Sequence, residues 1–306
     1  MPNIIINNYC NQKCSYCFAN ANMKDKKLQK DMSISTYLNI LKFLNKSNDK
    51  NVRILGWEPI LSPNIRKFLL LAYKWWFNII VFSNINIDHE KIKTIFSWLE
   101  WIRINCNIND KDFYNKNEII NINQNIEILN NLWIKIIIWY NITDIEKFPS
   151  LTFNLAEKYN ISAINIKITN STLDWRLLIN NSSRELWIYI FNIIIKYHKK
   201  YFLEFSCWLD KSIFLAEELG YINNKTNIKL KFGCDWNIWK FDINTDWTIF
   251  KCYPLEQIFK DKIYSFINIK NILDNNIHTE SIIKTLSKWL ISDWECTANK
   301  IIKSKI

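Results

Sequence analysis

Residues 4–17 read IIINNYCNQKCSYC, an apolar run followed closely by three cysteines, Cys10, Cys14 and Cys17. The apolar run predicts a buried strand over residues 4–8. The three thiols then lie just beyond the carboxyl end of that strand, in a polar segment. Thiolates are the ligands that iron–sulfur clusters select, and a short loop can wrap three of them around one cubane. This stretch therefore predicts a strand that leads into a metal-binding loop.

No fourth ligand stands near these cysteines in the sequence. A metal centre with an open coordination position is typical of a catalytic site, whereas structural sites are closed. A structural zinc site needs one more ligand, and His89, His198 and His278 are far away in sequence, with no paired spacing to cysteine. The pattern favours a catalytic cluster over structural zinc or three incidental buried cysteines.

Short isoleucine-rich runs alternate with helical patterns as far as about residue 200. Apolar residues at helical spacing predict helices around 37–44, 65–72, 92–99, 119–129 and 186–197, with Asp88 as the N-cap of the third. Repeated β-then-α units predict a parallel sheet, either a full or partial barrel or an open doubly wound sheet. In both, ligands bind at the carboxyl ends of the strands. The predicted strands are residues 4–8, 51–55, 78–83, 102–107, 134–140 and 163–169.

The composition is that of a globular protein. The chain has 306 residues, of which 49% are hydrophobic and 23% charged. No apolar run reaches the roughly 18 residues of a membrane-spanning helix, and no secretion signal is visible. We expect a cytoplasmic protein without membrane contact, whose eight cysteines are metal ligands or reactive thiols rather than disulfides. The net charge of +11 can indicate a nucleic-acid partner, although the scattered lysines also fit AT-rich coding.

Tryptophan and glycine occur in unusual numbers. The chain has 15 Trp and only 3 Gly, where average usage gives roughly 21 Gly. Trp76 follows a helix at the place where a Gly C-cap is usual, and Asp-Trp stands where Asp-Gly turns are expected, at 174–175, 235–236, 246–247 and 293–294. We hypothesise that many of these Trp are Gly in the organism, through a UGA codon that it reads as Gly. A truly tryptophan-rich protein is the alternative.

The C-x3-C-x2-C spacing, with the aromatic Tyr16 before the last cysteine, resembles the radical S-adenosylmethionine (SAM) superfamily. The resemblance implies a partial (β/α)6 TIM-type barrel and a [4Fe–4S] cluster whose fourth iron binds the amino and carboxylate groups of SAM. It implies that one electron then cleaves SAM to methionine and a 5′-deoxyadenosyl radical, which abstracts hydrogen from a substrate. An electron donor such as flavodoxin or ferredoxin is implied as well. The cofactor would carry the chemistry, so that no acid–base dyad is needed.

Three further features resemble the SAM contacts of that family. Ser83 and Asn84 are similar to its Thr-Asn pair near the SAM ribose, and Lys167 either faces the SAM carboxylate or is solvated. A Gly-Gly-Glu-Pro motif, whose backbone receives the methionine end of SAM, is matched by Gly56, Trp57, Glu58 and Pro59. The alternative for Glu58 is a solvated carboxylate on a loop, without a role in binding. An indole at the second position would intrude on the space for SAM, so the motif is intact only if that residue is recoded.

A second set of cysteines follows residue 200. Cys234, Trp247 and Cys252 resemble the C-x(9–15)-G-x4-C pattern of the SPASM and twitch auxiliary-cluster extensions, with Trp247 in the Gly position at the tip of a predicted hairpin of residues 237–241 and 248–252. Cys207 and Cys296 would complete a four-thiolate [4Fe–4S] site of the twitch form. A zinc site of the same four cysteines, or four unrelated buried cysteines, are the alternatives.

These features predict two domains and an enzyme. Residues 1–200 would form the radical SAM partial barrel, and residues 201–306 a small α+β auxiliary-cluster domain with a β-hairpin and helices, one of them at 278–290. The substrate would be a peptide, a protein or a small molecule, and no peptide-binding extension precedes the barrel. The alternative function is a non-catalytic iron–sulfur or zinc protein that binds nucleic acid through its basic surface. A radical SAM enzyme acting on RNA is a third possibility.

Overall fold

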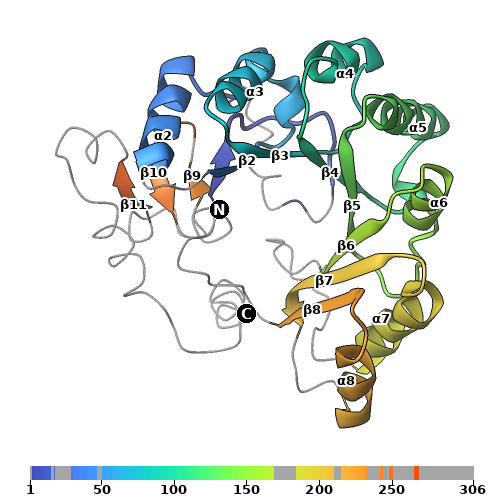
Figure 1. Ribbon diagram of the computed structural model, residues 1–306. Helices are drawn as coiled ribbons and strands as arrows, with labels where there is room; N and C mark the ends of the chain where they lie inside the picture. The colour runs from blue at the N-terminus through green and yellow to red at the C-terminus, as the bar shows by residue number, and fades with distance from the viewer. Residues whose placement is uncertain are drawn as a thin grey trace.

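A parallel sheet, bent into an arc, forms the body of the molecule (Figure 1). The computed structural model describes residues 2–14, 17, 29–46, 50–168, 184–209, 215–232, 242–243, 245, 248–250 and 265–268. The eight parallel strands are β1 (Asn3–Ile5), β2 (Asn51–Leu55), β3 (Asn78–Ser83), β4 (Arg103–Ile108), β5 (Lys135–Ile142), β6 (Ala163–Ile168), β7 (Phe202–Leu209) and β8 (Ile228–Phe232). They lie side by side in chain order, and β8 ends the described sheet without pairing to β1. The predicted α/β fold is therefore confirmed as a partial TIM-type barrel.

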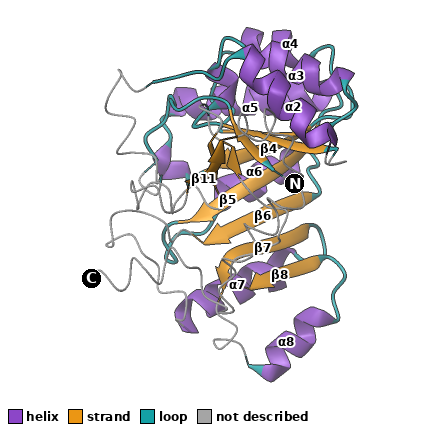
Figure 2. Cartoon of the chain, turned by 90° about the vertical axis from the view of Figure 1, so that its left-hand side faces the viewer, coloured by secondary structure: helices purple, strands orange, loops and turns teal. Residues whose placement is uncertain are grey.

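Helices cover the convex side of the arc, as Figures 1 and 2 show. Each packs an apolar stripe on the sheet; Ile65, Phe68 and Leu69, for example, are buried at helical spacing. Asp88 caps the third helix, since its side chain accepts a hydrogen bond from the Lys91 backbone N–H at 3.0 Å. None of the described helices combines the length and the apolar character needed to cross a bilayer. The helices are α2 (Ile34–Lys46), α3 (Ile65–Lys74), α4 (His89–Phe96), α5 (Lys116–Asn131), α6 (Ser150–Lys158), α7 (Arg184–Tyr197) and α8 (Ala216–Asn223).

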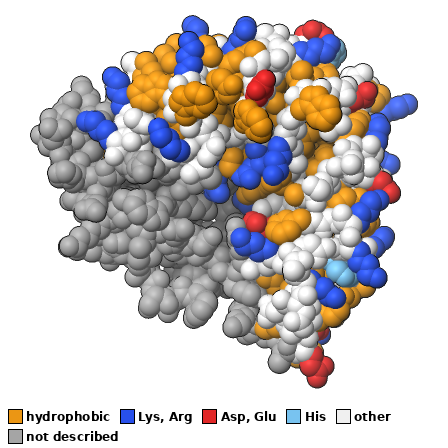
Figure 3. Space-filling view, in the orientation of Figure 1, with side chains coloured by type: hydrophobic (Ala, Val, Ile, Leu, Met, Phe, Trp, Pro, Cys, Tyr) orange, Lys and Arg blue, Asp and Glu red, His pale blue; other side chains and the backbone are white. Residues whose placement is uncertain are grey.

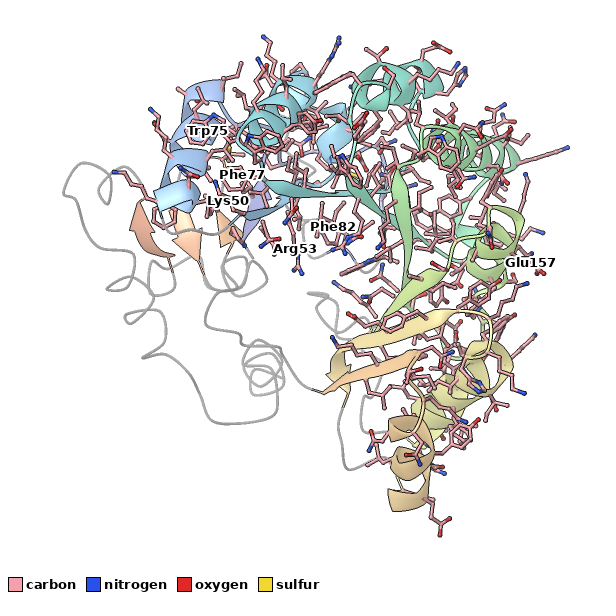
Figure 4. The ribbon with its side chains drawn as sticks, in the orientation of Figure 1. Lys50, Arg53, Trp75, Phe77, Phe82 and Glu157 are labelled. Atoms are coloured by element: carbon pink, nitrogen blue, oxygen red, sulfur yellow. The ribbon has the colours of Figure 1, made fainter. Side chains whose placement is uncertain are left out.

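The two faces of the sheet differ in polarity. Along β5, Ile136, Ile138 and Tyr140 are buried towards the helices, whereas the intervening residues are partly exposed on the other face. Figure 4 shows Arg53 of β2 and Phe82 of β3 on the concave side of the arc. The core lies between sheet and helices, and the concave face carries polar and aromatic side chains.

Several elements differ from the sequence predictions. The first strand is shorter than residues 4–8, and α6 was not among the predicted helices. The β/α rhythm was expected to change after residue 200, but β7 and β8 continue the parallel sheet. Leu203 and Phe205 of β7 are buried, and they pair with Ile164 and Ile166 of β6, which explains the continuation. The division into residues 1–200 and 201–306 remains a prediction.

Three short strands extend the sheet beyond β1. They are β9 (Asp242–Ile243), which pairs in parallel with β1, β10 (Thr248–Phe250) and β11 (Ser265–Asn268). β9 and β10 pair antiparallel, as the arms of the predicted hairpin would; the predicted first arm, residues 237–241, lies outside the described residues. The predicted helix at 278–290 and the four Asp-Trp pairs lie outside the described residues. So do the predicted site residues Tyr16, Cys234, Trp247, Cys252 and Cys296.

Candidate metal centre

The cysteine loop lies at the carboxyl ends of the first strands. The Glu58 backbone N–H, just after β2, donates to the Tyr9 carbonyl at 3.0 Å, which ties the loop to the second β/α unit. Cys14 is buried, Cys10 and Cys17 are half-buried, and all three are thiols rather than disulfides. The Cys17 backbone N–H donates to the Cys14 carbonyl at 3.0 Å, so the loop turns back on itself between the second and third cysteines.

Two of the sulfur atoms receive N–H donors. The Gln12 backbone N–H lies 3.3 Å from the Cys10 sulfur, and the Asn84 side-chain amide donates to the same sulfur at 3.6 Å. The Asn109 side-chain amide donates to the Cys14 sulfur at 3.5 Å. Donors of this kind favour a thiolate, which is the form of cysteine that binds metal.

The electrostatics of the loop favour the protonated thiol at Cys10 unless a cation is bound. Burial raises the pKa of Cys10 to about 12, and the negative charges of Glu58, Cys14 and Cys17 add to the rise, against the Gln12 N–H, which lowers it. Thiolates so close together repel each other, and a bound cation removes this penalty. The donor set therefore fits a metal cofactor.

A single metal ion and a cubane place different demands on the cysteine loop. Among the described residues, no three His, Cys, Asp or Glu side chains converge on one position as the ligands of one metal ion do. A cubane offers a separate iron to each cysteine, so its ligands need not converge.

Gly56, after β2, is in close contact with Asn7. A Cβ atom at position 56 would lie 1.9 Å from the Asn7 Oδ1 atom, which no side chain tolerates. The Asn7 side-chain amide in turn donates to the Glu58 carbonyl at 2.8 Å. The small residue at position 56 is therefore what allows the first strand and the 56–59 segment to meet.

Glu58 is a buried carboxylate that links two strand ends. It accepts hydrogen bonds from the Ile60 N–H at 3.0 Å, the Ser83 hydroxyl at 2.9 Å and the Asn84 N–H at 2.7 Å. Burial raises its pKa to about 7, although the three donors lower it. This arrangement excludes a solvated loop carboxylate, and it joins Pro59, at the start of a short 3-10 helix, to the Ser83–Asn84 pair.

The two remaining predicted SAM contacts, Trp57 and Lys167, lie on different strand ends or strands of the sheet. Trp57 is half-buried beside Glu58. Lys167, on β6, lies with its ammonium 4.1 Å from the Trp139 ring centroid, and the Phe82 ring meets Trp139 edge-on at 4.8 Å. Lys167 is thus held against an aromatic side chain three strands from the Ser83 strand.

Sequence reasoning missed the carboxamides around the loop. Asn11 is held from both sides, since its Oδ1 accepts from the Asn84 amide at 2.9 Å and its own amide donates to the Asn86 carbonyl at 2.6 Å. Asn109 follows β4 as Asn84 follows β3, so a polar residue directly after a buried strand was the available signal.

Two other cysteines are placed by the fold. Cys106 is fully buried on β4 among core side chains, as a small core residue would be. Cys207 lies within β7, whose parallel partner is β6.

One family model matches the part of the chain that contains the candidate site. Residues 4–142 match the model of the radical SAM superfamily. That range includes the cysteine loop, the 56–59 segment, Ser83, Asn84 and Asn109. No curated protein matches the chain in sequence.

Solved structures share the fold at low identity. SuiB of Streptococcus suis, in a structure with the precursor peptide SuiA, is 15% identical with a TM-score of 0.63, over 98% of this chain and 72% of SuiB. The protein anSMEcpe, in a structure with AdoMet and the Cp18Cys peptide, is 12% identical with a TM-score of 0.61, over 98% of this chain and 81% of anSMEcpe. At these identities the likeness concerns the fold alone.

Proposed function

We propose that the chain is a radical SAM enzyme in which Cys10, Cys14 and Cys17 hold a [4Fe–4S] cluster, since residues 4–142 match the model of that superfamily. When bound, the cluster and SAM supply reductive cleavage of SAM to a 5′-deoxyadenosyl radical that abstracts hydrogen from substrate. One observation carries the proposal: three cysteines at C-x3-C-x2-C spacing lie on one loop, and two of their sulfurs receive N–H donors from neighbouring strand ends.

The chain's own residues prepare the place for SAM. The Glu58 carboxylate fixes the backbone of the 56–59 segment against Ser83 and Asn84, and Gly56 allows the close approach of Asn7. We propose that this braced backbone receives the methionine end of SAM, with Ser83 and Asn84 towards the ribose. Lys167 is the proposed contact for the SAM carboxylate.

Anaerobic reconstitution with iron and sulfide tests the function. The proposal expects about four iron atoms per cluster and 5′-deoxyadenosine formation that requires reductant. Cys14→Ala should abolish SAM cleavage, whereas Cys106→Ala, which changes a core cysteine outside the loop, should retain it. Unchanged cleavage in Cys14→Ala would refute the ligand assignment. RNA binding with a steep salt dependence and no SAM cleavage would favour the nucleic-acid alternative.

The distribution of basic side chains gives that alternative little support. In the face that Figure 3 shows, Lys and Arg are spread over the described surface among hydrophobic and uncharged side chains. A nucleic-acid interface gathers its basic residues on one patch or stripe.

We propose a peptide as the substrate class and a flavodoxin or ferredoxin as the electron donor. SuiB and anSMEcpe, which share the fold, have each been solved with a peptide bound. Incubation with candidate precursor peptides encoded near the gene, followed by mass spectrometry, tests the peptide substrate. We propose a cytoplasmic location, where the chain would meet these partners.

A second cluster, held by Cys207, Cys234, Cys252 and Cys296 in a twitch-like domain, is a separate proposal. Its support is the hairpin of β9 and β10, which lies between the second and third of these cysteines in sequence. An iron content of about eight per chain, falling to about four in Cys252→Ala, is the expected result.

We also propose that several Trp are Gly in the natural product, through recoded UGA. Trp76 and Trp133 stand one residue past the C-caps of α3 and α5, each at φ 60°, and Trp101, before β4, stands at φ 64°. Their side chains are 86%, 94% and 90% exposed, in that order. Left-handed backbone favours Gly and strains other side chains, and an exposed indole gains no burial in return.

The hydrogen bonds at these helix ends are those of a Schellman motif, which usually has Gly at this position. After α3, the Trp76 N–H donates to the Tyr73 carbonyl at 2.9 Å and the Phe77 N–H to the Ala72 carbonyl at 3.1 Å. After α5, Trp133 and Ile134 donate in the same pattern. The coding DNA tests the proposal: UGA codons at these positions, and Gly by mass spectrometry of the native protein, are expected, and UGG codons would end it.

A further inference from the structure

Two carboxamides at neighbouring strand ends point their N–H groups at cysteine sulfurs. Asn84, after β3, donates to Cys10 at 3.6 Å, and Asn109, after β4, donates to Cys14 at 3.5 Å. Both asparagines are buried, and the contact between Asn109 and Cys14 is buried as well. An N–H aimed at a ligating sulfur stabilises negative charge on the cluster, and hydrogen bonds to the sulfurs are among the features that set a cluster's reduction potential.

The Asn84 amide is held in a fixed orientation. Its Oδ1 accepts from the Asn86 N–H at 2.9 Å, its backbone N–H donates to Glu58, and its amide also donates to Asn11. These contacts decide which end of the amide faces the sulfur, because Oδ1 has a donor of its own.

The backbone that follows Asn84 is strained and braced from α5. Ile85 is fully buried at φ 48°, a region that β-branched residues avoid. The buried Asn125 side-chain amide donates to the Ile85 carbonyl at 2.7 Å and to the Ile87 carbonyl at 2.6 Å. Strain of this kind persists only where the surroundings over-determine it, and it is concentrated at functional sites. The brace therefore keeps Asn84 against the cysteine loop.

Asn109 is fixed independently. It is buried, and its backbone N–H donates to the Tyr114 hydroxyl at 2.9 Å, beyond the short 3-10 helix η3 (Lys111–Phe113). This support comes from Tyr114, whereas the 84–87 loop is supported by Asn125 of α5, so the two donors are held by different side chains.

We propose that Asn84 and Asn109 are positioning residues whose N–H groups raise the reduction potential of the cluster held by Cys10, Cys14 and Cys17. This inference rests on the proposed function. Reduction adds one electron from an external one-electron donor, and the added negative charge is partly carried by the cysteine sulfurs that the two amides face. Without these donors the reduced form is less stable, and a stronger reductant is needed.

The test is a potentiometric titration with dithionite, followed by EPR, on the reconstituted full chain. Asn109→Leu and Asn109→Asp both remove the donor at nearly constant size, and Asn84→Leu removes the other. All three should shift the midpoint potential to more negative values at unchanged iron content. The matched control is Asn105→Leu, which changes a buried carboxamide on the same strand, four residues earlier, and should leave the midpoint unchanged.

Each outcome decides the proposal. Unchanged midpoints in the Asn84 and Asn109 variants, with SAM cleavage intact, would overturn the inference and leave the proposed function standing. Loss of iron in the Asn84 and Asn109 variants, with full iron content in Asn105→Leu, would show that the two amides retain the cluster rather than set its potential. That result would also overturn the inference. A wild-type chain that assembles no cluster would overturn the proposed function itself.

Discussion

At the scale of single residues, Gly56 leaves no room for a side chain. A Cβ there would meet Asn7 Oδ1 at 1.9 Å, so Gly56→Ala must displace the Asn7 side chain and lose its bond to the Glu58 carbonyl. We expect a loss of about 1–3 kcal/mol in the free energy of unfolding, measured by urea denaturation, and weaker SAM binding.

Gly220 provides the matched control for this change. It lies in α8, and a Cβ there meets nothing within 4 Å. Gly220→Ala should therefore stabilise the chain by up to about 1 kcal/mol, because Ala favours the helix. Equal effects of the two substitutions would contradict the tight packing at Gly56.

Glu58 predicts how stability depends on pH. Burial raises its pKa to about 7 in the folded chain, above the ordinary value of an unfolded glutamate. The folded state therefore holds its proton more tightly, so this group's stabilisation is present below about pH 4.3 and is lost as pH rises through about 7. The loss is on the order of 3 kcal/mol across this window. Urea unfolding of the metal-free chain at a series of pH values measures it.

Glu58→Gln removes the titrating group while keeping its shape. In this variant the free energy of unfolding should change less between pH 4.5 and 7.5 than in the wild type. At pH 7.5 it should approach the value of the wild type at low pH, reduced by the contribution of one hydrogen bond. A profile that keeps the wild-type slope would show that another group is responsible.

At the scale of elements, the helix ends carry the clearest strain. Trp76 and Trp133 have left-handed backbone at exposed positions, and Trp→Gly there should raise the free energy of unfolding by about 1 kcal/mol each. Trp187, fully buried within α7, is the control, since Trp187→Gly leaves a cavity and should cost about 3–5 kcal/mol. Thermal or urea unfolding distinguishes the two classes; destabilisation by Gly at positions 76 and 133 would argue against recoding there.

Sequence patterns predicted most elements because their apolar spacing was regular. The strands at 51–55 and 78–83 have the predicted bounds, since each is a short run bounded by polar residues. α6 was missed because buried Leu151, Thr152 and Phe153 are consecutive and hide the helical period. β1 ends earlier than predicted, since the register with β2 stops at Ile5 and the backbone of Asn7 forms a bridge with Asp31 instead.

The candidate site was predictable in part. The cysteine spacing located the loop, and the strand ends located Glu58, Ser83 and Asn84. The buried contacts among them depend on loop backbone such as that of Ile85, whose positive φ no propensity predicts. The donors to the sulfurs therefore required the fold.

At the scale of the whole molecule, the sheet crosses the predicted domain division. β7 pairs with β6, and buried Leu203 and Phe205 lie beyond residue 200. A chain ending at residue 200 exposes the β6 edge and loses about 1.5–3 kcal/mol for each of these side chains. We expect it to be less soluble and less cooperative in urea than a chain ending at residue 232. Cooperative unfolding of the shorter chain would instead support an independent first domain.

The place of β1 has a consequence for synthesis on the ribosome. Its neighbours are β2, made soon afterwards, and β9, which is made more than two hundred residues later. Throughout that interval one edge of the first strand has no partner strand and can pair with other polypeptides. The cysteines that follow the strand lie close to this edge in sequence. If these cysteines hold a cluster, its assembly and the protection of this edge concern the same early segment, which is completed only when the last third of the chain has emerged.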